Sequence, residues 1–362
     1  MKKIFLSIAI IATVAAIVVG ATTAYFSDTE TSTGNTFSAG TIDIAVDGQN
    51  PWQSTGQYNL VDMKPSQVSY INFTVNNVGT NPANVWKNLT NIVTEENGIN
   101  EPECAAYEGT WNGQTCVDPD PELVNNAIDE VITYDLSVKV FQPEGLEPVW
   151  WQTIYTGLDT ETIQQIYGQN PNGVLLGMIP AGWRMEVTQS YHMAAETGNW
   201  AQSDKMTFNI SLYAEQLAGT VWMENKDFAN ADNPTIIHND GIEGTLEYTV
   251  KAATFDYEFN GRAPLANTSY TLIFYEEAFS TPSATGWPRN VIDLGTAVSN
   301  GSGDVTIGPS SINFNGDILN MKVWLVKTSD LNAGHTQMTG WTNNGEDTLY
   351  ELGLMDYYDS LI

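Results

Sequence analysis

The feature that most constrains the fold of this chain is a recurring alternation of apolar and polar residues. In the segment 133–141 the two kinds of residue alternate from Thr133 to Val140. Because successive side chains of a β-strand point to opposite faces, this pattern is typical of a half-buried strand. Alternating or strongly β-forming segments recur at 41–47, 68–75, 83–92, 183–193 and 206–216, and then at 244–252, 269–275, 303–307 and 321–326. The sequence therefore predicts an all-β protein.

Turn-forming Pro, Gly and Asn residues separate these segments, which indicates antiparallel strands. We expect a jelly-roll-type sandwich over residues 41–218. Residues 219–240 lose the alternation and are rich in Asn and Asp, so a linker is expected there. The strand pattern then resumes and predicts a second, smaller β-sandwich over residues 241–362. Residues 159–167 predict a short helix, with Asp159 or Thr160 as its N-cap.

The first 24 residues have the composition of a secretory signal peptide. Lys2 and Lys3 form a basic start, residues 4–20 are almost wholly apolar, and cleavage is expected between Ala24 and Tyr25. A retained membrane anchor is the alternative, since the apolar run approaches the length that spans a bilayer. We expect cleavage because small residues end the run and no basic flank follows. Contact with a membrane would then end with cleavage.

The chain carries a formal net charge of −30, and removal of Lys2 and Lys3 with the signal peptide makes it −32. Nucleic acids and anionic membranes would repel such a protein, so neither is expected as a partner. A solvated acidic surface accounts for this charge, and loose binding of divalent cations is an alternative.

Residues 95–126 predict an insertion in the first module, because they are acidic, rich in Pro and hold both cysteines. Cys104 and Cys116 are expected to pair, since an exported chain meets an oxidising compartment. A disulfide closing so short a loop stabilises by about 3 kcal/mol in the chain-entropy model. A metal site is the weaker alternative, because no His cluster or further Cys lies near in the sequence.

Three histidines, His192, His238 and His335, are far apart in the sequence. A zinc peptidase needs His ligands at helical spacing together with a carboxylate base, and none of the three has such a partner. His192 lies in a predicted strand, so we expect a core-edge or surface residue rather than a metal ligand. The sequence also has no nucleophile elbow, phosphate loop or dinucleotide fingerprint. No catalytic residue and no enzymatic activity are predicted.

No cofactor is expected, although two acidic runs offer oxygen ligands to calcium. Asp227 and Asp232 form one weak candidate, and Asp118 and Asp120 form the other. Neither run matches an EF-hand loop, and a solvated acidic loop is the alternative for both. Sequons that permit N-glycosylation in a competent host occur at Asn72, Asn88, Asn209, Asn267 and Asn300.

Two blocks of the sequence carry a family resemblance. The N-terminal block contains Ala24-Tyr25-Phe26-Ser27-Asp28, Gly34-Asn35-Thr36-Phe37 and Ala39-Gly40-Thr41-Ile42-Asp43-Ile44. The later block contains residues 179–183, 198–199, 202–204 and 208–216. Together they resemble the TasA/camelysin family of secreted fibre-forming proteins, over scattered parts of residues 25–217, and bundling archaeal pilins are similar in plan. The resemblance implies a jelly-roll domain, cleavage by a dedicated signal peptidase and assembly into extracellular fibres.

In such fibres the freed N-terminus is a donor strand that completes the sheet of the next subunit. The resemblance therefore implies that residues 25–40 form a donor arm anchored by Tyr25, Phe26 and Phe37. The implied protein is secreted and becomes part of an extracellular filament at the cell surface or in a biofilm matrix. Its partners would be copies of itself, and neighbouring filaments in bundles.

The chain departs from compact members of the family through the Cys-containing insertion and the second module. Residues 265–272 and 322–326 of that module weakly resemble transthyretin-like or immunoglobulin-like adhesion domains. Two other functions remain as alternatives: a secreted camelysin-like metallopeptidase, and a monomeric cell-surface adhesin or glycan-binding protein.

Overall fold

The computed structural model describes residues 41–52, 58–61, 63–64, 66–124, 127–156, 161–170, 173–217, 219–229, 234–275 and 288–360. The predicted signal peptide, its cleavage site and the donor arm with Tyr25, Phe26 and Phe37 lie outside these residues. Among the residues described, strands predominate, and the all-β prediction is confirmed. No helix in this part of the chain is long and apolar enough to cross a membrane.

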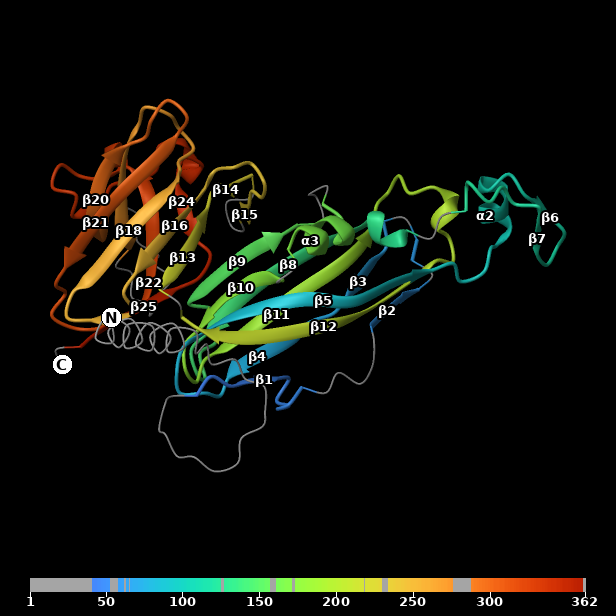
Figure 1. Cartoon of the computed structure of the whole chain (residues 1–362), viewed down its shortest axis with the longest axis horizontal. Helices are drawn as coiled ribbons and strands as arrows, with labels where there is room; N and C mark the ends of the chain where they lie inside the picture. Colours follow the sequence, from blue (N-terminus) through green and yellow to red (C-terminus); the bar gives the residue numbers. More distant parts are fainter. Residues whose placement is uncertain are drawn as a thin grey trace, which may run out of the picture.

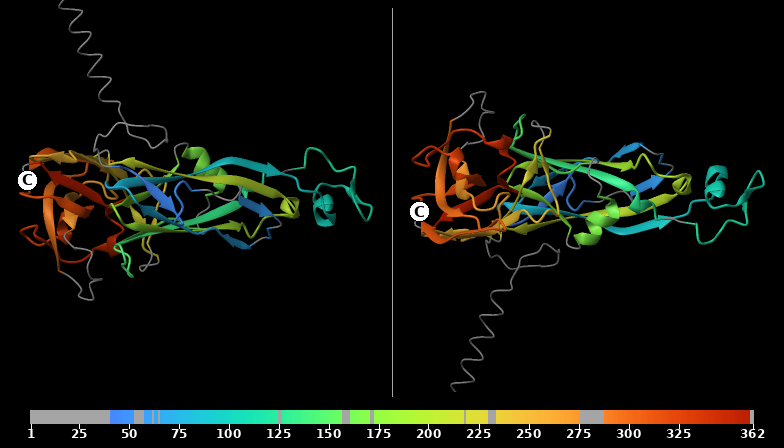
Figure 2. Two further views of the ribbon diagram at one scale, coloured as in Figure 1. Left: turned by 90° about the horizontal axis from the view of Figure 1, so that it is seen from below. Right: turned by 90° about the horizontal axis from the view of Figure 1, so that it is seen from above.

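The first module is a sandwich of two sheets that lie face to face (Figures 1 and 2). One sheet has the order β1-β4-β11-β8-β9, and β3 also pairs with β11. Its strands are β1 (Ile44–Val46), β3 (Val68–Tyr70), β4 (Phe73–Asn77), β8 (Ile132–Phe141), β9 (Trp150–Tyr155) and β11 (Arg184–Met193). The other sheet has the order β10-β5-β12-β2. Its strands are β2 (Tyr58–Val61), β5 (Ala83–Glu95), β10 (Val174–Ile179) and β12 (Lys205–Gln216).

Consecutive strands cross between the two sheets in the order that defines a jelly roll. Taken along the chain, β2, β4, β5, β8, β9, β10, β11 and β12 are strands one to eight, with β3 beside β4. The sheets then read 1-8-3-6 and 2-7-4-5, which is a double Greek key. The predicted jelly-roll sandwich is therefore confirmed.

The core of the jelly roll lies between these sheets. Tyr134, Leu136, Val138 and Val140 of β8 are buried, as the alternation at 133–141 predicted, and Phe208 of β12 belongs to the same cluster. Burying a large apolar side chain contributes about 1.5–3 kcal/mol, so this alternation fixes which face of β8 points inward.

Short helices are confined to the connections, with bounds α2 (Glu101–Ala106), α3 (Ile163–Gln169), η1 (Ile128–Glu130), η2 (Asn199–Ala201), η3 (Thr328–Asp330) and η4 (Asn343–Gly345). The helix expected at 159–167 is α3, but its predicted N-cap was wrong. Thr162 is the N-cap, because its hydroxyl accepts from the Gln165 backbone while the Gln165 side chain bonds back in a capping box.

The Cys-containing insertion projects from one end of the jelly roll, opposite to the end that meets the second module (Figures 1 and 2). It consists of α2 followed by a small hairpin of β6 (Thr110–Trp111) and β7 (Cys116–Val117). A disulfide joins Cys104 of α2 to Cys116, as predicted. The bond ties the helix to the hairpin.

The second module is one long sheet that curls over its own core, with the order β21-β18-β16-β13-β24-β22-β19-β20-β23. Leu246, Phe255, Phe259, Leu272 and Leu325 are fully buried inside it. β25 pairs with β22 and β17. The strands are β13 (Thr220–Glu224), β16 (Glu243–Tyr248), β17 (Lys251–Ala252), β18 (Phe255–Arg262), β19 (Ser269–Tyr275), β20 (Arg289–Val298), β21 (Asp304–Ile312), β22 (Ile318–Lys327), β23 (Gln337–Met338), β24 (Leu349–Glu351) and β25 (Met355–Asp359).

The segment 219–240, expected to be a linker, contains strands of both modules. β13 already belongs to the second module, which therefore begins at Thr220 rather than at 241. β14 (Lys226–Asp227) and β15 (Thr235–Ile236) return to the jelly roll, where β15 pairs in parallel with β9. Two-residue strands are too short to produce an alternating pattern, so the Asn and Asp residues around them dominated the sequence signal.

Side chains of β9 and β24 hold the two modules together. Trp150 is buried, and its indole N–H donates to Glu351 Oε1 at 3.3 Å. Lys226 Nζ donates to Gln152 Oε1 at 3.2 Å and lies 5.0 Å from the centre of the Tyr350 ring. This contact buries charged groups from both modules.

Candidate functional site

The two sheets of the jelly roll have four edge strands, and those on one side are covered. At the β9 edge, β15 and β14 extend the sheet. At the β10 edge the backbone of the second module lies against the strand, since a Cβ atom on Gly353 would be 3.2 Å from the Met178 nitrogen. On the opposite side, β1 and β2 each pair with a single strand among the described residues. Open sheet edges therefore occur on the side of β1, the first described strand of the chain.

At this open side of the β10-β5-β12-β2 sheet, β12 is much longer than its neighbour β2. β2 pairs only with the start of β12, from Lys205 to Phe208. On its other side β12 pairs with β5 along its whole length to Gln216. The outer edge of residues 209–216 thus has no strand partner in the described part of the chain. We call these residues the β12 open edge.

The β12 open edge has an apolar inner face. Ile210 is buried, while Leu212 and Ala214 are half-buried and pack against the jelly-roll core. The opposite face carries Tyr213, which stacks on Trp86 with ring centres 6.1 Å apart. Backbone N–H and C=O groups at such an edge are a template for another strand, whose side chains would complete the cover over Leu212 and Ala214.

The arm predicted to act as the donor strand, residues 25–40, leads directly into β1. β1 is the edge strand of the facing sheet and pairs only with β4 among the described residues. β1 and β2 both lie along the lower margin of the jelly roll in Figure 1, with β1 toward the second module. An arm that leaves the subunit here starts beside the open side of the sandwich.

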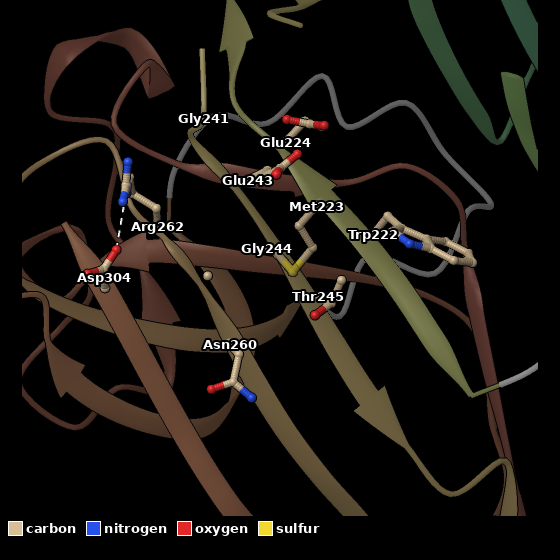
Figure 3. A pocket seen from close by; sticks show the side chains of 11 residues that line it. Trp222, Met223, Glu224, Gly241, Glu243, Gly244, Thr245, Asn260, Arg262 and Asp304 are labelled. Carbon is tan, nitrogen blue, oxygen red and sulfur yellow. Dashed lines mark hydrogen bonds and ion pairs between the residues drawn. The ribbon is translucent and has the colours of Figure 1, made fainter. Parts of the chain in front are cut away.

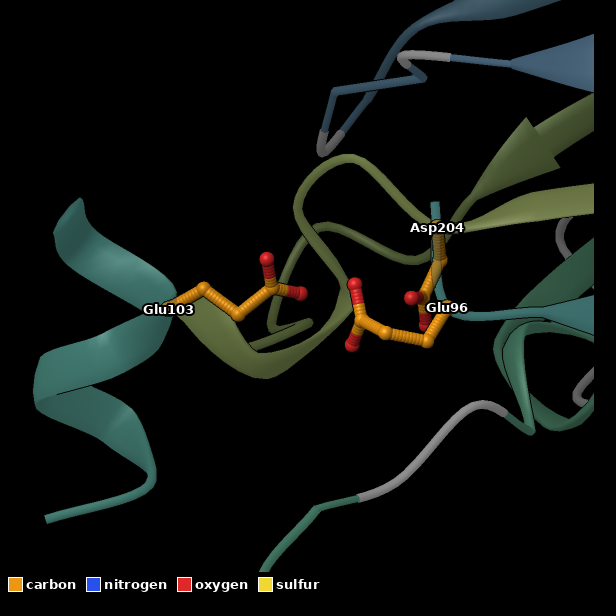
Figure 4. Close-up of side chains that lie close together, drawn as sticks. All are labelled: Glu96, Glu103 and Asp204. Atoms are coloured by element: carbon orange, nitrogen blue, oxygen red, sulfur yellow. The ribbon is translucent and has the colours of Figure 1, made fainter. Parts of the chain in front are cut away.

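Three carboxylates meet at the base of the insertion (Figure 4). Glu96 follows β5, Glu103 lies on α2 and Asp204 precedes β12, and one oxygen of each lies within 4.8 Å of the others. Glu103 and Asp204 are fully buried. Burial, with added repulsion from the neighbouring carboxylates, raises the pKa of Glu103 and of Asp204 to about 7. Among the described residues, this is the one group of at least three acidic, His or Cys side chains that could share a metal ion.

His192 does not have the geometry of a catalytic triad. Ser190 Oγ and Asp135 Oδ2 lie 3.0 Å and 2.5 Å from the same atom, His192 Nε2. A catalytic triad needs the acid and the nucleophile on different ring nitrogens. His238 stacks on Tyr155, and His335 belongs to the second module. His192 is therefore a partly exposed residue paired with an acid.

The calcium candidates from the sequence lie apart from the carboxylate cluster. Asp227 is exposed and accepts a hydrogen bond from the Ala229 backbone, and Asp232 lies outside the described residues. Asp118 is exposed, and Asp120 caps a turn by accepting from the Glu122 backbone.

The sequons differ in accessibility. Asn72, Asn267 and Asn300 are exposed, whereas Asn88 and Asn209 are half-buried within strands β5 and β12. The first three offer better acceptors for glycosylation than the last two.

A pocket of about 620 Å³ lies over the outer face of β13, β16 and β18 (Figure 3). Glu224 and Glu243 stand on directly paired positions of β13 and β16, and Arg262 forms an ion pair with Asp304 at 3.1 Å. Burial and repulsion from Glu243 and Asp240 raise the pKa of Glu224 to about 8. No reaction follows from this arrangement.

Comparison with known proteins gives one match. Residues 1–103 match the family model described as camelysin metallo-endopeptidase, and the matched region ends within α2. No curated protein and no solved structure matches the chain. A jelly roll whose N-terminal part matches the camelysin model is the class of protein that the fold and this match define. The match over residues 1–103 agrees with the N-terminal motifs and is consistent with a relationship to the TasA/camelysin family, which supports a secreted or cell-surface protein.

Proposed function

We propose that this protein is a structural subunit of an extracellular filament. In this proposal each copy inserts its N-terminal arm beside the β12 open edge of the next copy. The observation that carries the proposal is the outer edge of residues 209–216, which lacks a strand partner among the described residues although the edges on the other side are covered.

The dimensions of arm and edge are compatible. At about 3.3 Å per residue the eight residues of the open edge span roughly 26 Å, and the arm can extend to roughly 50 Å. Tyr25 and Phe37 are an even number of residues apart, so an extended arm would point both to the same face. Burying each aromatic anchor would contribute about 1.5–3 kcal/mol.

The geometry of exchange favours a filament over a closed dimer. Each subunit would give one arm and receive one at a different surface, so the contact is head-to-tail and need not close. The main-chain hydrogen bonds would supply affinity, and pockets for alternate side chains would supply specificity. Signal cleavage before Tyr25 would free the arm and so permit assembly.

A peptidase is the alternative that the printed name of the family model raises. Our proposal is favoured by the arrangement of the three histidines, since His192 pairs with Asp135, His238 stacks on Tyr155 and His335 pairs with Asp293. The alternative would be supported by chelator-sensitive cleavage of casein by the purified mature protein.

Deletion of residues 25–37 tests the proposal. Negative-stain electron microscopy should reveal filaments of the mature protein and monomers of the deletion variant. A synthetic peptide of residues 25–40 should bind the deletion variant at one site per chain. The matched control is Tyr70→Ser, which changes an exposed aromatic residue on β3 and should leave filaments intact. Normal filaments from the deletion variant would overturn the proposed connector.

A further inference from the structure

The carboxylate cluster is assembled by three separate segments. Lys205 and Glu95 are paired positions at the end of the β5–β12 ladder, and their side chains form an ion pair at 3.2 Å. Glu96 and Asp204 are the next residues outward on the two strands, so the ladder brings them side by side. Glu103 comes from α2, where it is the third residue of the helix and part of a capping box with Asn100. The side chains point toward one another (Figure 4).

Four oxygens of this cluster are buried without a hydrogen-bond partner, namely Glu96 Oε1, Glu103 Oε1 and both carboxylate oxygens of Asp204. Asp204 has no exposed surface. No Lys, Arg or His in the described ranges forms an ion pair with any of the three acids. A buried carboxylate without a partner costs several kcal/mol, so this arrangement calls for a positive charge.

Further acceptor oxygens surround the cluster. Ser203 Oγ lies 2.9 Å from Glu103 Oε2, 2.6 Å from the Gly98 carbonyl oxygen and 2.5 Å from its neighbour's carbonyl oxygen at Gln202. A hydroxyl has one proton and can donate to only one of these three acceptors. The site therefore holds more oxygen acceptors than its donors satisfy.

We propose that Glu96, Glu103 and Asp204 bind a Ca²⁺ ion that fixes the insertion to the end of the jelly roll. Calcium takes oxygen ligands at 2.3–2.6 Å, so ligands on opposite sides of one ion lie about 5 Å apart. The separation of at most 4.8 Å between the three oxygens fits that limit. The absence of His and Cys from the cluster disfavours zinc, and Mg²⁺ would retain more water than a buried site admits.

The ion would add a strong link between the insertion and the jelly roll to the hydrogen bonds that already join them. The insertion follows β5 and stands at the end of the molecule away from the second module (Figure 1). Its other links to the jelly roll include the Tyr107 hydroxyl, which donates to the Trp200 carbonyl at 2.7 Å. With Ca²⁺ bound, α2 would be held between the ends of β5 and β12. Without it, three carboxylates would repel one another.

Calorimetric titration of the chelator-treated mature protein with Ca²⁺ tests the proposal. We expect one saturable site, and at least a tenfold loss of affinity in Glu103→Gln/Asp204→Asn. Glutamine preserves the capping box, since it can also bond back to the N-cap backbone. The matched control, Asp118→Asn/Asp120→Asn, removes two acids from the same insertion and should bind Ca²⁺ as the wild type does.

The melting temperature provides a second readout, measured for the wild type and the variant with and without Ca²⁺. The Glu103→Gln/Asp204→Asn variant should melt at a higher temperature than the wild type without Ca²⁺, because repulsion is relieved, yet gain nothing when Ca²⁺ is added. In the wild type, Ca²⁺ should slow hydrogen exchange of residues 98–107. Two results would overturn the site: no saturable binding to the wild type at millimolar Ca²⁺, or equal binding by the wild type and this variant.

Discussion

Replacing Cys104 and Cys116 with alanine should weaken Ca²⁺ binding by up to about 100-fold. Glu103 precedes the disulfide-bonded Cys104 on α2, a helix of six residues. A helix this short is not stable in isolation, so the disulfide and its surroundings must hold Glu103 in place. The cysteines are 12 residues apart, and closing such a loop is worth about 3 kcal/mol in the chain-entropy model. If binding must supply that ordering energy, the affinity falls by about two powers of ten.

The assay is the same calorimetric titration, applied to the wild type and to Cys104→Ala/Cys116→Ala. Loss of both thiols and of the disulfide is verified by mass spectrometry. Neither cysteine belongs to the jelly-roll core cluster, so the main thermal transition should shift little. An affinity within twofold of the wild type would refute the reasoning, because Glu103 would then be positioned without the disulfide.

Three further predictions concern the cores and the module interface. Lys226→Met should lower the free energy of unfolding in urea by about 3–5 kcal/mol, because the buried Glu351 loses one of the two lysines, Lys226 and Lys322, that stabilise its charge. Adding Glu351→Gln should restore part of the loss. Equal stability of wild type and single variant would contradict this. Gly177→Ala should lower the free energy of unfolding by about 2 kcal/mol or more in the same assay, since φ is +120° at this residue and the new Cβ would lie 2.8 Å from the Trp150 ring. An unchanged urea midpoint would contradict this prediction. Burial lowers the pKa of Lys87 well below 10.5, so the unfolded chain binds more protons than the folded one and wild-type stability should rise with pH toward 10.5. Lys87→Met should flatten that rise between pH 7 and 9.5, and an identical pH dependence in both proteins would count against it.

Strands with one buried face were predictable from the sequence. The alternating segment 133–141 corresponds to β8 and 183–193 to β11, and both cover the jelly-roll core on one side. β9 gave no such signal, because Gln152 and Thr153 are buried together with their apolar neighbours. Both faces of that strand are covered from Gln152 to Tyr155, where it also meets the second module, whereas Trp151 is exposed.

The disulfide, the carboxylate cluster and the β12 open edge differ in how well the sequence predicted them. The disulfide was predictable because the chain holds only two cysteines and its first 24 residues predict export. The carboxylate cluster was not, since Glu96, Glu103 and Asp204 come from three segments and acidic residues occur throughout the chain. The only local signal was Glu103 three residues after Asn100, the spacing of a capping box. The β12 open edge was equally hidden, because it depends on how far β2 extends along β12.

The most direct test of filament assembly is an electron cryo-microscopy reconstruction of the processed protein at a resolution that traces the backbone. We predict that residues 25–37 of one subunit run as an added strand beside residues 209–216 of the next. Filaments in which each arm packs against its own subunit, with residues 209–216 left unpaired, would contradict the proposal.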